Sequence, residues 1–210
     1  MGGIAIGTAA LILILSVFNG FEDLITSLFG TFNPDVKITV EVGKTFELDS
    51  TTVRRMERVP GVEAVSATLE EIAFFEYENV QDFGLLKGVD EHFPEVVDIE
   101  ASVVEGRFQV QDGDRALAVL GSALRNKLAV NVLDPFEAMR VYVPKRKNVG
   151  PLGKAYNSRL LAPAGTFFIQ QDYDNEYVMT SLPFVQGLLE QRGEVSALEV
   201  GVVEGFPVAE

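Results

Sequence analysis

The chain opens with a long apolar segment. From Gly2 to Phe21 no residue carries a charge, and Ala9–Phe18 is almost wholly apolar. A helix of about twenty residues is about 30 Å long, which matches the hydrocarbon core of a lipid bilayer. A buried helix of a soluble protein is usually shorter, and a signal peptide would carry basic residues first, whereas the first basic residue here is Lys37. The segment therefore predicts a transmembrane helix.

The helical pattern continues beyond the charges at Glu22 and Asp23. Apolar residues recur at helical spacing on one face, and the two carboxylates lie on another. This apolar stripe consists of Phe21, Leu24, Ile25, Leu28, Phe29 and Phe32. Gly30 and Pro34 then favour an end to the helix. We therefore expect residues 1–32 to form one transmembrane helix with an amphipathic extension. No basic residue stands before this helix, which suggests that the native protein has a cytoplasmic segment before Met1.

Polar and apolar residues alternate along much of the remaining chain, which is typical of half-buried strands. Strands are predicted at 35–42, 62–77, 81–89, 138–143, 164–171, 177–180 and 196–203, with a break or bulge near Glu70 and Glu71. Short helices are predicted at 50–58 and 121–128 and from Ser181 to Gly193, and a short acidic turn or helix at 90–97. Asp174 and Asn175 indicate a tight turn that joins the strands at 164–171 and 177–180 in a hairpin. The fold class is α+β, with strands outnumbering short helices.

Composition narrows the function classes. About 180 residues follow the helix, enough for one large domain or two small ones. The formal net charge of −14 argues against nucleic acid, and against an anionic membrane face, because each would need a basic patch. Cysteine is absent, which excludes disulfides, thiol catalysis and thiolate metal sites.

The search for catalytic or metal-binding residues predicts none. The single histidine, His92, has acidic neighbours but no second histidine to complete a ligand set. Glu70 and Glu71 are neighbours on a predicted strand, so their side chains point to opposite faces and do not form an acid/base pair. Residues 150–154 lack the spacing of a phosphate loop, and residues 172–176 lack the glycine and the distal glutamate of a calcium loop. We expect no enzyme active site and no cofactor in this chain.

Ser16–Glu22 reads SVFNGFE, and five further segments stand out at 59–67, 85–90, 103–108, 117–130 and 164–178. Ser16–Glu22 is similar to the first membrane helix of the lipoprotein-releasing (Lol-type) permeases of ABC transporters, within the MacB/FtsX-like superfamily. The other segments are similar to that family in the same order. One departure lies at 131–135, where the family usually has a glycine-containing turn.

The resemblance implies a bacterial inner-membrane protein whose main domain is periplasmic. Residues 1–32 would form the membrane helix, 33–80 plus 164–210 a membrane-proximal lobe, and 81–163 an inserted β-rich lobe with a projecting loop. The chain would be a non-catalytic permease subunit that extracts lipoproteins from the membrane and passes them to a periplasmic carrier. A separate ATPase subunit would drive it, beside a second permease copy or paralogue. The alternative is a FtsX-like or MacB-like protein that binds a cell-wall hydrolase, an adaptor or an efflux partner.

The resemblance also suggests two sites. The apolar stripe at 21–32 would contact the acyl chains of the lipoprotein; the alternative is ordinary packing against the missing helices or the domain's own strands. The loop at 147–160 resembles the hook by which one permease type engages its carrier, although a flexible surface loop is the alternative. The positions carried over to this partner-binding loop are Pro151, Leu152, Gly153, Lys154, Ser158 and Arg159.

Overall fold

The structure, a computed structural model, describes residues 11–17, 33–134, 136–145, 155–169, 171–203 and 205–206. The strands are β1 (Val36–Thr39), β2 (Phe46–Glu47), β3 (Val62–Tyr77), β4 (Val80–Val89), β5 (Val103–Gly106), β6 (Gln111–Asp112), β7 (Arg115–Gly121), β8 (Met139–Pro144), β9 (Tyr156–Phe167), β10 (Tyr177–Ser181), β11 (Glu194–Val195) and β12 (Ala197–Val202). The helices are α2 (Ser50–Met56), α3 (Phe93–Val96), α4 (Ser122–Leu128), α5 (Gln171–Glu176) and α6 (Leu182–Leu189), with a 3₁₀ turn at Glu100–Ser102.

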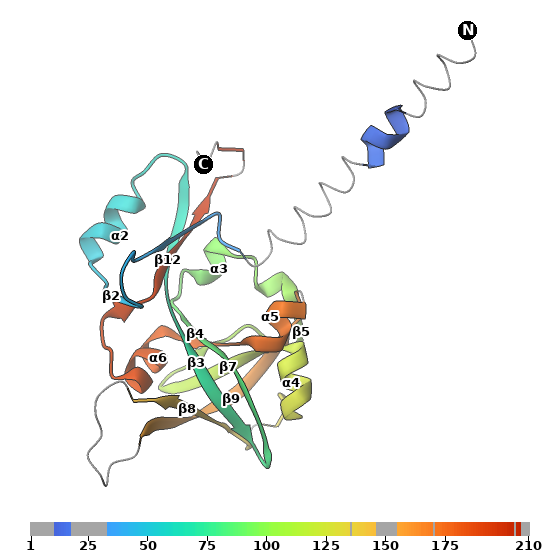
Figure 1. The fold of residues 1–210 in the computed structure, drawn as a ribbon, viewed down its shortest axis with the longest axis vertical. Coiled ribbons are helices and arrows are strands. Elements are labelled where there is room, and N and C mark those ends of the chain that lie inside the picture. Colours follow the sequence, from blue (N-terminus) through green and yellow to red (C-terminus); the bar gives the residue numbers. More distant parts are fainter. Residues whose placement is uncertain are drawn as a thin grey trace.

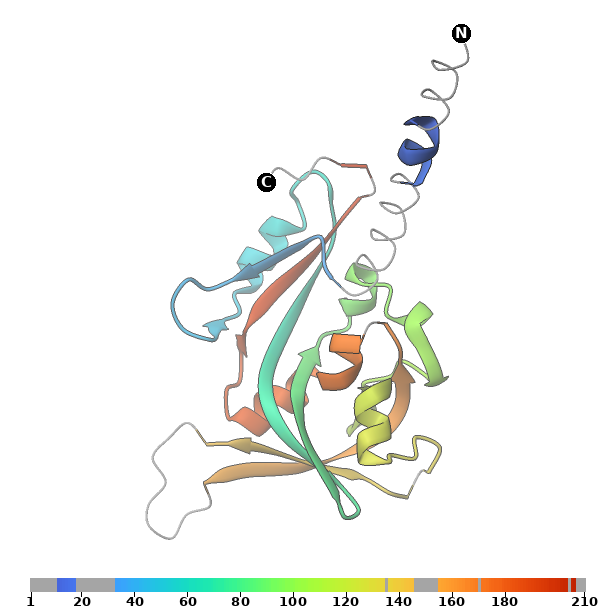
Figure 2. The ribbon, with the colours of Figure 1, turned by 45° about the vertical axis from the view of Figure 1, so that its right-hand side comes forward.

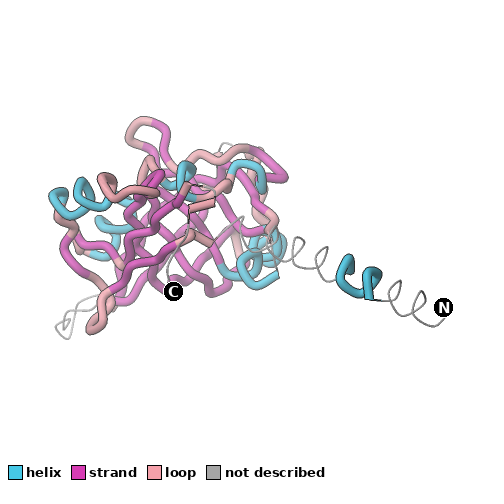
Figure 3. The backbone as a smooth tube through the Cα atoms, turned by 90° about the horizontal axis from the view of Figure 1, so that it is seen from above, coloured by secondary structure: helices cyan, strands magenta, loops and turns pink. Residues whose placement is uncertain are grey.

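Among the described residues, ten strands form one large sheet in the order β1-β12-β3-β4-β10-β7-β9-β5, in which β6 pairs with β7 and β8 pairs with both β3 and β9 (Figure 1). Strands β2 and β11 form a separate two-stranded sheet. Because β8 joins these two strands, β3, β4, β10, β7, β9 and β8 close into a ring. The β4–β10 and β7–β9 pairs are parallel, and the other pairs of the ring are antiparallel. Seen from above, the strands gather at the centre and the helices lie at the periphery (Figure 3).

The main core lies within the ring. All six of its strands contribute fully buried side chains to one cluster, which are Phe75, Leu86, Val178, Leu120, Leu161 and Val141. Leucines of α4 and α6 pack against the same cluster. A smaller cluster on the outer face joins β4, β7, β9 and β10 to α3, with Phe93 at its centre. Burial of these two clusters is the main force that holds the sheet together.

Most predicted elements are present. β1, β3, β4, β8 and β12 lie within or close to the predicted strands, and β3 and β4 form an antiparallel hairpin. Helix α2 begins where predicted because Asp49 Oδ1 accepts a hydrogen bond of 2.9 Å from the amide of Thr51. Helices α4 and α6 also form, and Phe184, Val185 and Leu188 of α6 are buried.

Three details were predicted wrongly. The pairing of β3 with β4 runs without interruption through Glu70 and Glu71, so there is no bulge. Residues 164–180 do not form a hairpin, because both β9 and β10 pair with β7 and the connection between them contains α5. Helix α6 ends at Leu189, with Glu190 in the left-handed conformation, and Gly193 lies beyond the end.

Of the predicted membrane helix at 1–32, residues 11–17 are helical and the others lie outside the described residues. The described part of the chain contains no helix with the length and apolarity needed to span a membrane. The predicted division into two lobes stays a prediction. The sheet crosses its boundaries, since β3 pairs with β4 and β10 pairs with β7.

Candidate functional site

An exposed group of apolar and aromatic side chains covers part of the outer face of the ring. We define this aromatic surface as Ile72 and Phe74 of β3, Phe83 of β4, Tyr142 of β8 and Tyr156 of β9. The ring centroids of Phe74 and Phe83 are 4.9 Å apart, and those of Tyr142 and Tyr156 are 5.4 Å apart. Ile72 is 60% exposed and Phe83 is 66% exposed. Contiguous apolar patches of this kind mark interaction sites.

A groove begins where β3 and β8 separate. The two strands pair only from Phe74 to Glu76, and beyond Phe74 they diverge. The opening between them has a volume of about 700 Å³, and all five residues of the aromatic surface line it. Lys44 and Glu71 also line the groove, with 3.3 Å between Lys44 Nζ and Glu71 Oε1. A mainly apolar groove with few polar groups suits an apolar side chain or chain of a partner.

A hydrogen bond fixes the position of Tyr142 in this surface. Its hydroxyl donates to the carboxylate of Glu76 on the paired strand. The bond lowers the pKa of Glu76, with a second contribution from Gln81, and raises the pKa of Tyr142. Tyr142 is therefore held between Phe74 and Tyr156 as a neutral phenol.

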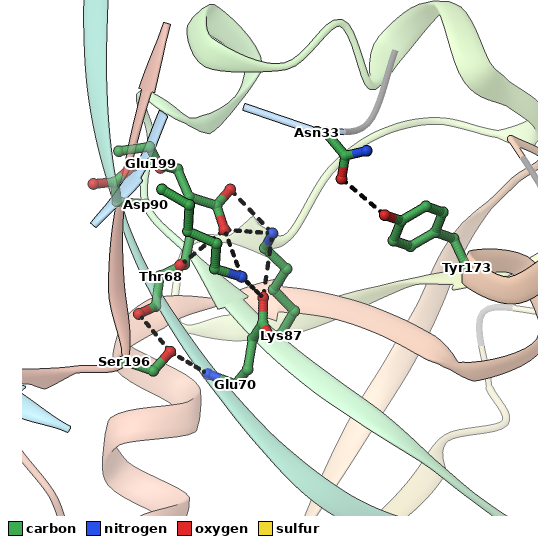
Figure 4. Close-up of polar contacts among 10 residues, drawn as sticks. Asn33, Thr68, Glu70, Lys87, Asp90, Tyr173, Ser196 and Glu199 are labelled. Carbon is green, nitrogen blue, oxygen red and sulfur yellow. Dashed lines mark hydrogen bonds and ion pairs between the residues drawn. The ribbon is translucent and has the colours of Figure 1, made fainter. Parts of the chain in front are cut away.

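A buried ionic cluster lies further along the same face of the sheet (Figure 4). We define the ionic cluster as Lys37 of β1, Glu70 of β3, Lys87 of β4 and Glu199 of β12. Lys87 Nζ is 2.8 Å and 3.0 Å from the two carboxylate oxygens of Glu199, and both side chains are almost fully buried. Lys37 Nζ completes the cluster at 3.1 Å from Glu70 and 3.6 Å from Glu199. Partial burial opposes the charge on Lys37, but the two carboxylates raise its pKa overall.

The segment that follows the predicted membrane helix is tied to the domain at two points. The Tyr173 hydroxyl donates a hydrogen bond of 2.8 Å to Asn33, as Figure 4 shows. Asp35 Oδ2 accepts one of 2.7 Å from the amide of Val202, at the end of β12. The start of the domain and the end of its last strand therefore lie side by side.

Comparison with known proteins identifies the family. The model of the MacB-like periplasmic core domain matches residues 1–183. The chain belongs to this family.

Solved structures share the fold of this MacB-like domain. The extracellular domain of the noncanonic ABC-type transporter YknZ from Gram-positive bacteria is 14% identical with a TM-score of 0.51, over 78% of this chain and 76% of that one. The periplasmic region of MacB from Actinobacillus actinomycetemcomitans is 13% identical with a TM-score of 0.51, over 77% and 68%. A permease domain from Porphyromonas gingivalis is 13% identical with a TM-score of 0.50, over 79% and 66%. The prediction of an α+β domain of the MacB/FtsX-like superfamily is confirmed.

The predicted partner-binding loop is only partly described. Pro151, Leu152, Gly153 and Lys154 lie outside the described residues, as does the apolar stripe Phe21, Leu24, Ile25, Leu28, Phe29 and Phe32. Strands β8 and β9 stay paired up to Pro144 and Tyr156, and the Lys145 amide donates a 2.9 Å hydrogen bond to Ala155. Strands β8 and β9 therefore form a hairpin, and its connecting residues 146–154 lie outside the described residues.

Ser158 and Arg159 lie in β9 on opposite faces of this MacB-like domain. Ser158 pairs with Tyr142, so it borders the aromatic surface. Arg159 lies against α6, where a Cβ atom on Gly187 would be 2.9 Å from its Nη1 atom. The structure brings Ser158 to the candidate site but directs Arg159 to the other face.

Glu70 and Glu71 lie on opposite faces of β3, as their neighbouring positions on a strand predicted. Glu70 joins the ionic cluster, and Glu71 contacts Lys44 on the other face of β3.

His92 does not gather a set of metal ligands in the described part of the chain. Its Nδ1 atom is 3.4 Å from Glu95 Oε1. Partial burial opposes the protonation of His92, but the acidic neighbours raise the pKa of His92 overall. Among the described residues, no three His, Cys, Asp or Glu side chains lie close enough together to hold a metal ion.

The aromatic surface was not predicted from the sequence, although a signal for it exists. A strand with one buried face alternates apolar and polar residues, but Ile72–Phe75 reads IAFF and is apolar on both faces. Ala73 and Phe75 fill the core, so Ile72 and Phe74 need a second partner. Residues on β8 and β9 complete the surface, and their position depends on the ring closure.

Proposed function

We propose that this chain is part of the membrane subunit of an ABC transporter, with its MacB-like domain on the periplasmic side. The family match and the fold shared with a domain of an ABC-type transporter support this. Residues 1–32 would anchor it in the bacterial inner membrane. In support, Leu11, Ile12, Leu13, Ile14, Leu15 and Val17 are each more than half exposed, and a helix that is apolar on all sides requires protein or lipid around it. A separate ATPase subunit would supply the energy, with a second permease copy or paralogue completing the assembly.

The substrate that we propose is a lipoprotein, which the complex extracts from the membrane and passes to a periplasmic carrier. The order of the Lol-type segments supports this choice. The stripe at 21–32 would contact its acyl chains at the membrane. The observation that carries the proposal is that a paired β8–β9 hairpin leaves the domain beside the aromatic surface. The loop at its end contains three basic residues in an acidic chain, and Lys145 precedes them. Basic and apolar groups side by side would attract and then hold an acidic carrier.

A MacB-like or FtsX-like role is the second candidate, because the matching family model is the MacB-like one. In that role the same surface would bind an efflux partner, an adaptor or a cell-wall hydrolase. The two candidates share the anchored permease and differ in what docks on the domain.

Co-purification of the complete protein from native membranes distinguishes them. We expect an ABC ATPase together with lipoproteins and their carrier. An ATPase with a hydrolase or an efflux partner would select the second candidate, and the absence of an ATPase would refute both. Leu24→Glu and Leu28→Glu, with normal expression, should abolish lipoprotein release; normal release would refute the role of the stripe.

Variants test the docking surface. Deletion of residues 148–157 or Phe83→Asp should abolish carrier capture without loss of the ATPase. The matched control is Leu133→Asp, since Leu133 is 72% exposed but lies outside the aromatic surface. Unaltered carrier capture by both test variants would exclude this surface.

A further inference from the structure

Helix α2 and the turn that follows it present a group of basic side chains to solvent. Arg54, Arg55 and Arg58 are all exposed, and α2 itself contributes no buried residue. Within the part of the chain that the structure describes, no acidic side chain forms an ion pair with these three guanidinium groups. Lys37 and Lys87 differ in this respect, because both contact carboxylates. The three arginines are therefore available to a negatively charged partner, in a chain whose formal net charge is −14.

Exposed apolar side chains lie directly beside these arginines. The turn from α2 into β3 contains Val59, which is 52% exposed, and Gly61, whose φ of 91° allows the tight reversal. The Phe206 ring covers Gly61, where a Cβ atom would lie 2.5 Å from it, and Phe206 remains 46% exposed. Val203 is 49% exposed and donates its amide to Gly61 O at 2.9 Å. We define the basic tip as Arg54, Arg55, Arg58, Val59, Val203 and Phe206.

The basic tip lies at the end of the domain where the chain enters and leaves. Asp35 binds the amide of Val202, the residue just before Val203. Figures 1 and 2 show the α2–β3 turn and the end of β12 at the end opposite the β3–β4 hairpin and the β8–β9 hairpin. If residues 1–32 anchor the chain, as proposed above, this end faces the bilayer.

We propose that the basic tip rests on the anionic headgroups of the bilayer that holds the chain. This inference depends on the proposed membrane anchoring. Guanidinium groups bind phosphate oxygens through two hydrogen bonds, and an aromatic ring with short aliphatic side chains enters the headgroup region readily. One exposed carboxylate, that of Glu57, lies among the three arginines, so residues 54–59 keep a net charge of +2 (three arginines and one glutamate). The remainder of the chain is acidic and would be repelled by the same lipids, so the charge distribution favours one orientation of the domain. The net charge of the whole chain does not reveal this patch.

Site-directed fluorescence quenching tests the contact. The 210-residue chain contains no cysteine, so Val59→Cys provides a single labelling position in it. The labelled chain is placed in nanodiscs of brominated lipid, with either phosphatidylcholine alone or an equimolar mixture with phosphatidylglycerol. We expect strong quenching in the mixture, weak quenching in phosphatidylcholine, and a decrease with added salt. Neutralising each arginine should shift the ratio of docked to undocked molecules by about fivefold.

Matched variants make the result specific. Arg54→Gln, Arg55→Gln and Arg58→Gln together should remove most of the quenching. Arg107→Gln, Arg140→Gln and Arg192→Gln change the net charge by the same amount outside the basic tip and should leave the quenching unchanged. A label at Val203 provides a second reporter if Val59→Cys disturbs the turn.

A label at Leu13, within the predicted membrane helix, separates the two proposals. Quenching at Leu13 but at neither Val59 nor Val203 would overturn the docking and leave the anchoring intact. No quenching at Leu13 would overturn both. Equal quenching at Val59 in the two lipids, or in the two triple variants, would show that the arginines are not responsible, which also overturns the proposal.

Discussion

Removal of one partner of the buried ion pair should destabilise the domain strongly. In Lys87→Met, Glu199 stays fully buried without the ammonium group at 2.8 Å. Loss of one partner from a buried pair typically costs about 3–5 kcal/mol. Lys37 is still 3.6 Å from Glu199, and Thr68 donates to it at 3.2 Å, so we expect the lower limit, about 3 kcal/mol. In a domain of this size that corresponds to a fall in Tm of about 6–12 °C.

The measurement is thermal unfolding of the detergent-solubilised chain at fixed pH and scan rate. The double variant Lys87→Met, Glu199→Leu should recover most of the loss, because Lys37 and Glu70 then remain as a balanced pair at 3.1 Å. Lys127→Met is the control, since its ion pair with Asp82, at 3.7 Å, is partly exposed and worth at most about 1 kcal/mol. If Lys87→Met unfolds like the control, or if the double variant is less stable than Lys87→Met, this reasoning about the cluster is wrong.

Three further predictions concern single residues and are checked by unfolding of the same preparation. His92→Gln should destabilise the chain at about pH 5.5 and have no effect at about pH 8.5. The pKa of His92 is raised in the folded state, so its protonation adds stability below the unfolded pKa of about 6.5, and this stability is lost as the pH rises through the folded pKa. An effect independent of pH would contradict this. Asp49→Ala has the opposite dependence, since hydrogen bonds from α2 lower the pKa of Asp49. Its destabilising effect should be present at neutral pH and be lost as the pH falls through the lowered pKa of the folded state. Gly121→Ala should cost about 1–3 kcal/mol, because the new Cβ atom would lie 2.4 Å from the carbonyl oxygen of Asp174; wild-type stability would show that α5 moves freely.

Elements with a local signal were predicted correctly. The alternation along β3 and β12 and the cap of α2 each depend on neighbouring residues, so the sequence contains the information. Strand β7 was missed because it pairs with both β9 and β10 and is buried on both faces, so RALAVLG does not alternate. The wrong hairpin at 164–180 has a similar origin. Asp174 and Asn175 do favour turns, but Asp174 Oδ1 instead accepts a hydrogen bond from the amide of Ile169 beside α5.

The candidate surfaces depend on contacts between distant segments, and for that reason the sequence alone did not reveal them. Glu70 and Glu199 are separated by more than a hundred residues, and only the pairing of β12 with β3 brings them to one cluster. The groove exists because β8 pairs with β3 for a few residues and then diverges. The basic tip is a local feature of α2, but its position beside Phe206 depends on the end of β12. The net charge of −14 for the whole chain gives no indication of this basic group.

Strand β3 connects the two proposed contact surfaces. It begins at Val62, directly after the turn of the basic tip, and passes the ionic cluster at Glu70 before it reaches Phe74 in the aromatic surface. Sixteen residues of extended chain span about 50 Å. Other strands pair with β3 along its length, so we expect β3 to move as one rigid element. A tilt of the basic tip against the bilayer would therefore move the groove and the β8–β9 hairpin as one body.

The ionic cluster stabilises the middle of β3, since its four charged side chains come from β1, β3, β4 and β12. A domain with Lys87→Met that still folds should consequently retain each surface but lose their fixed relative orientation, which distance measurements between labels at Val59 and Phe83 would detect as a broadened distribution.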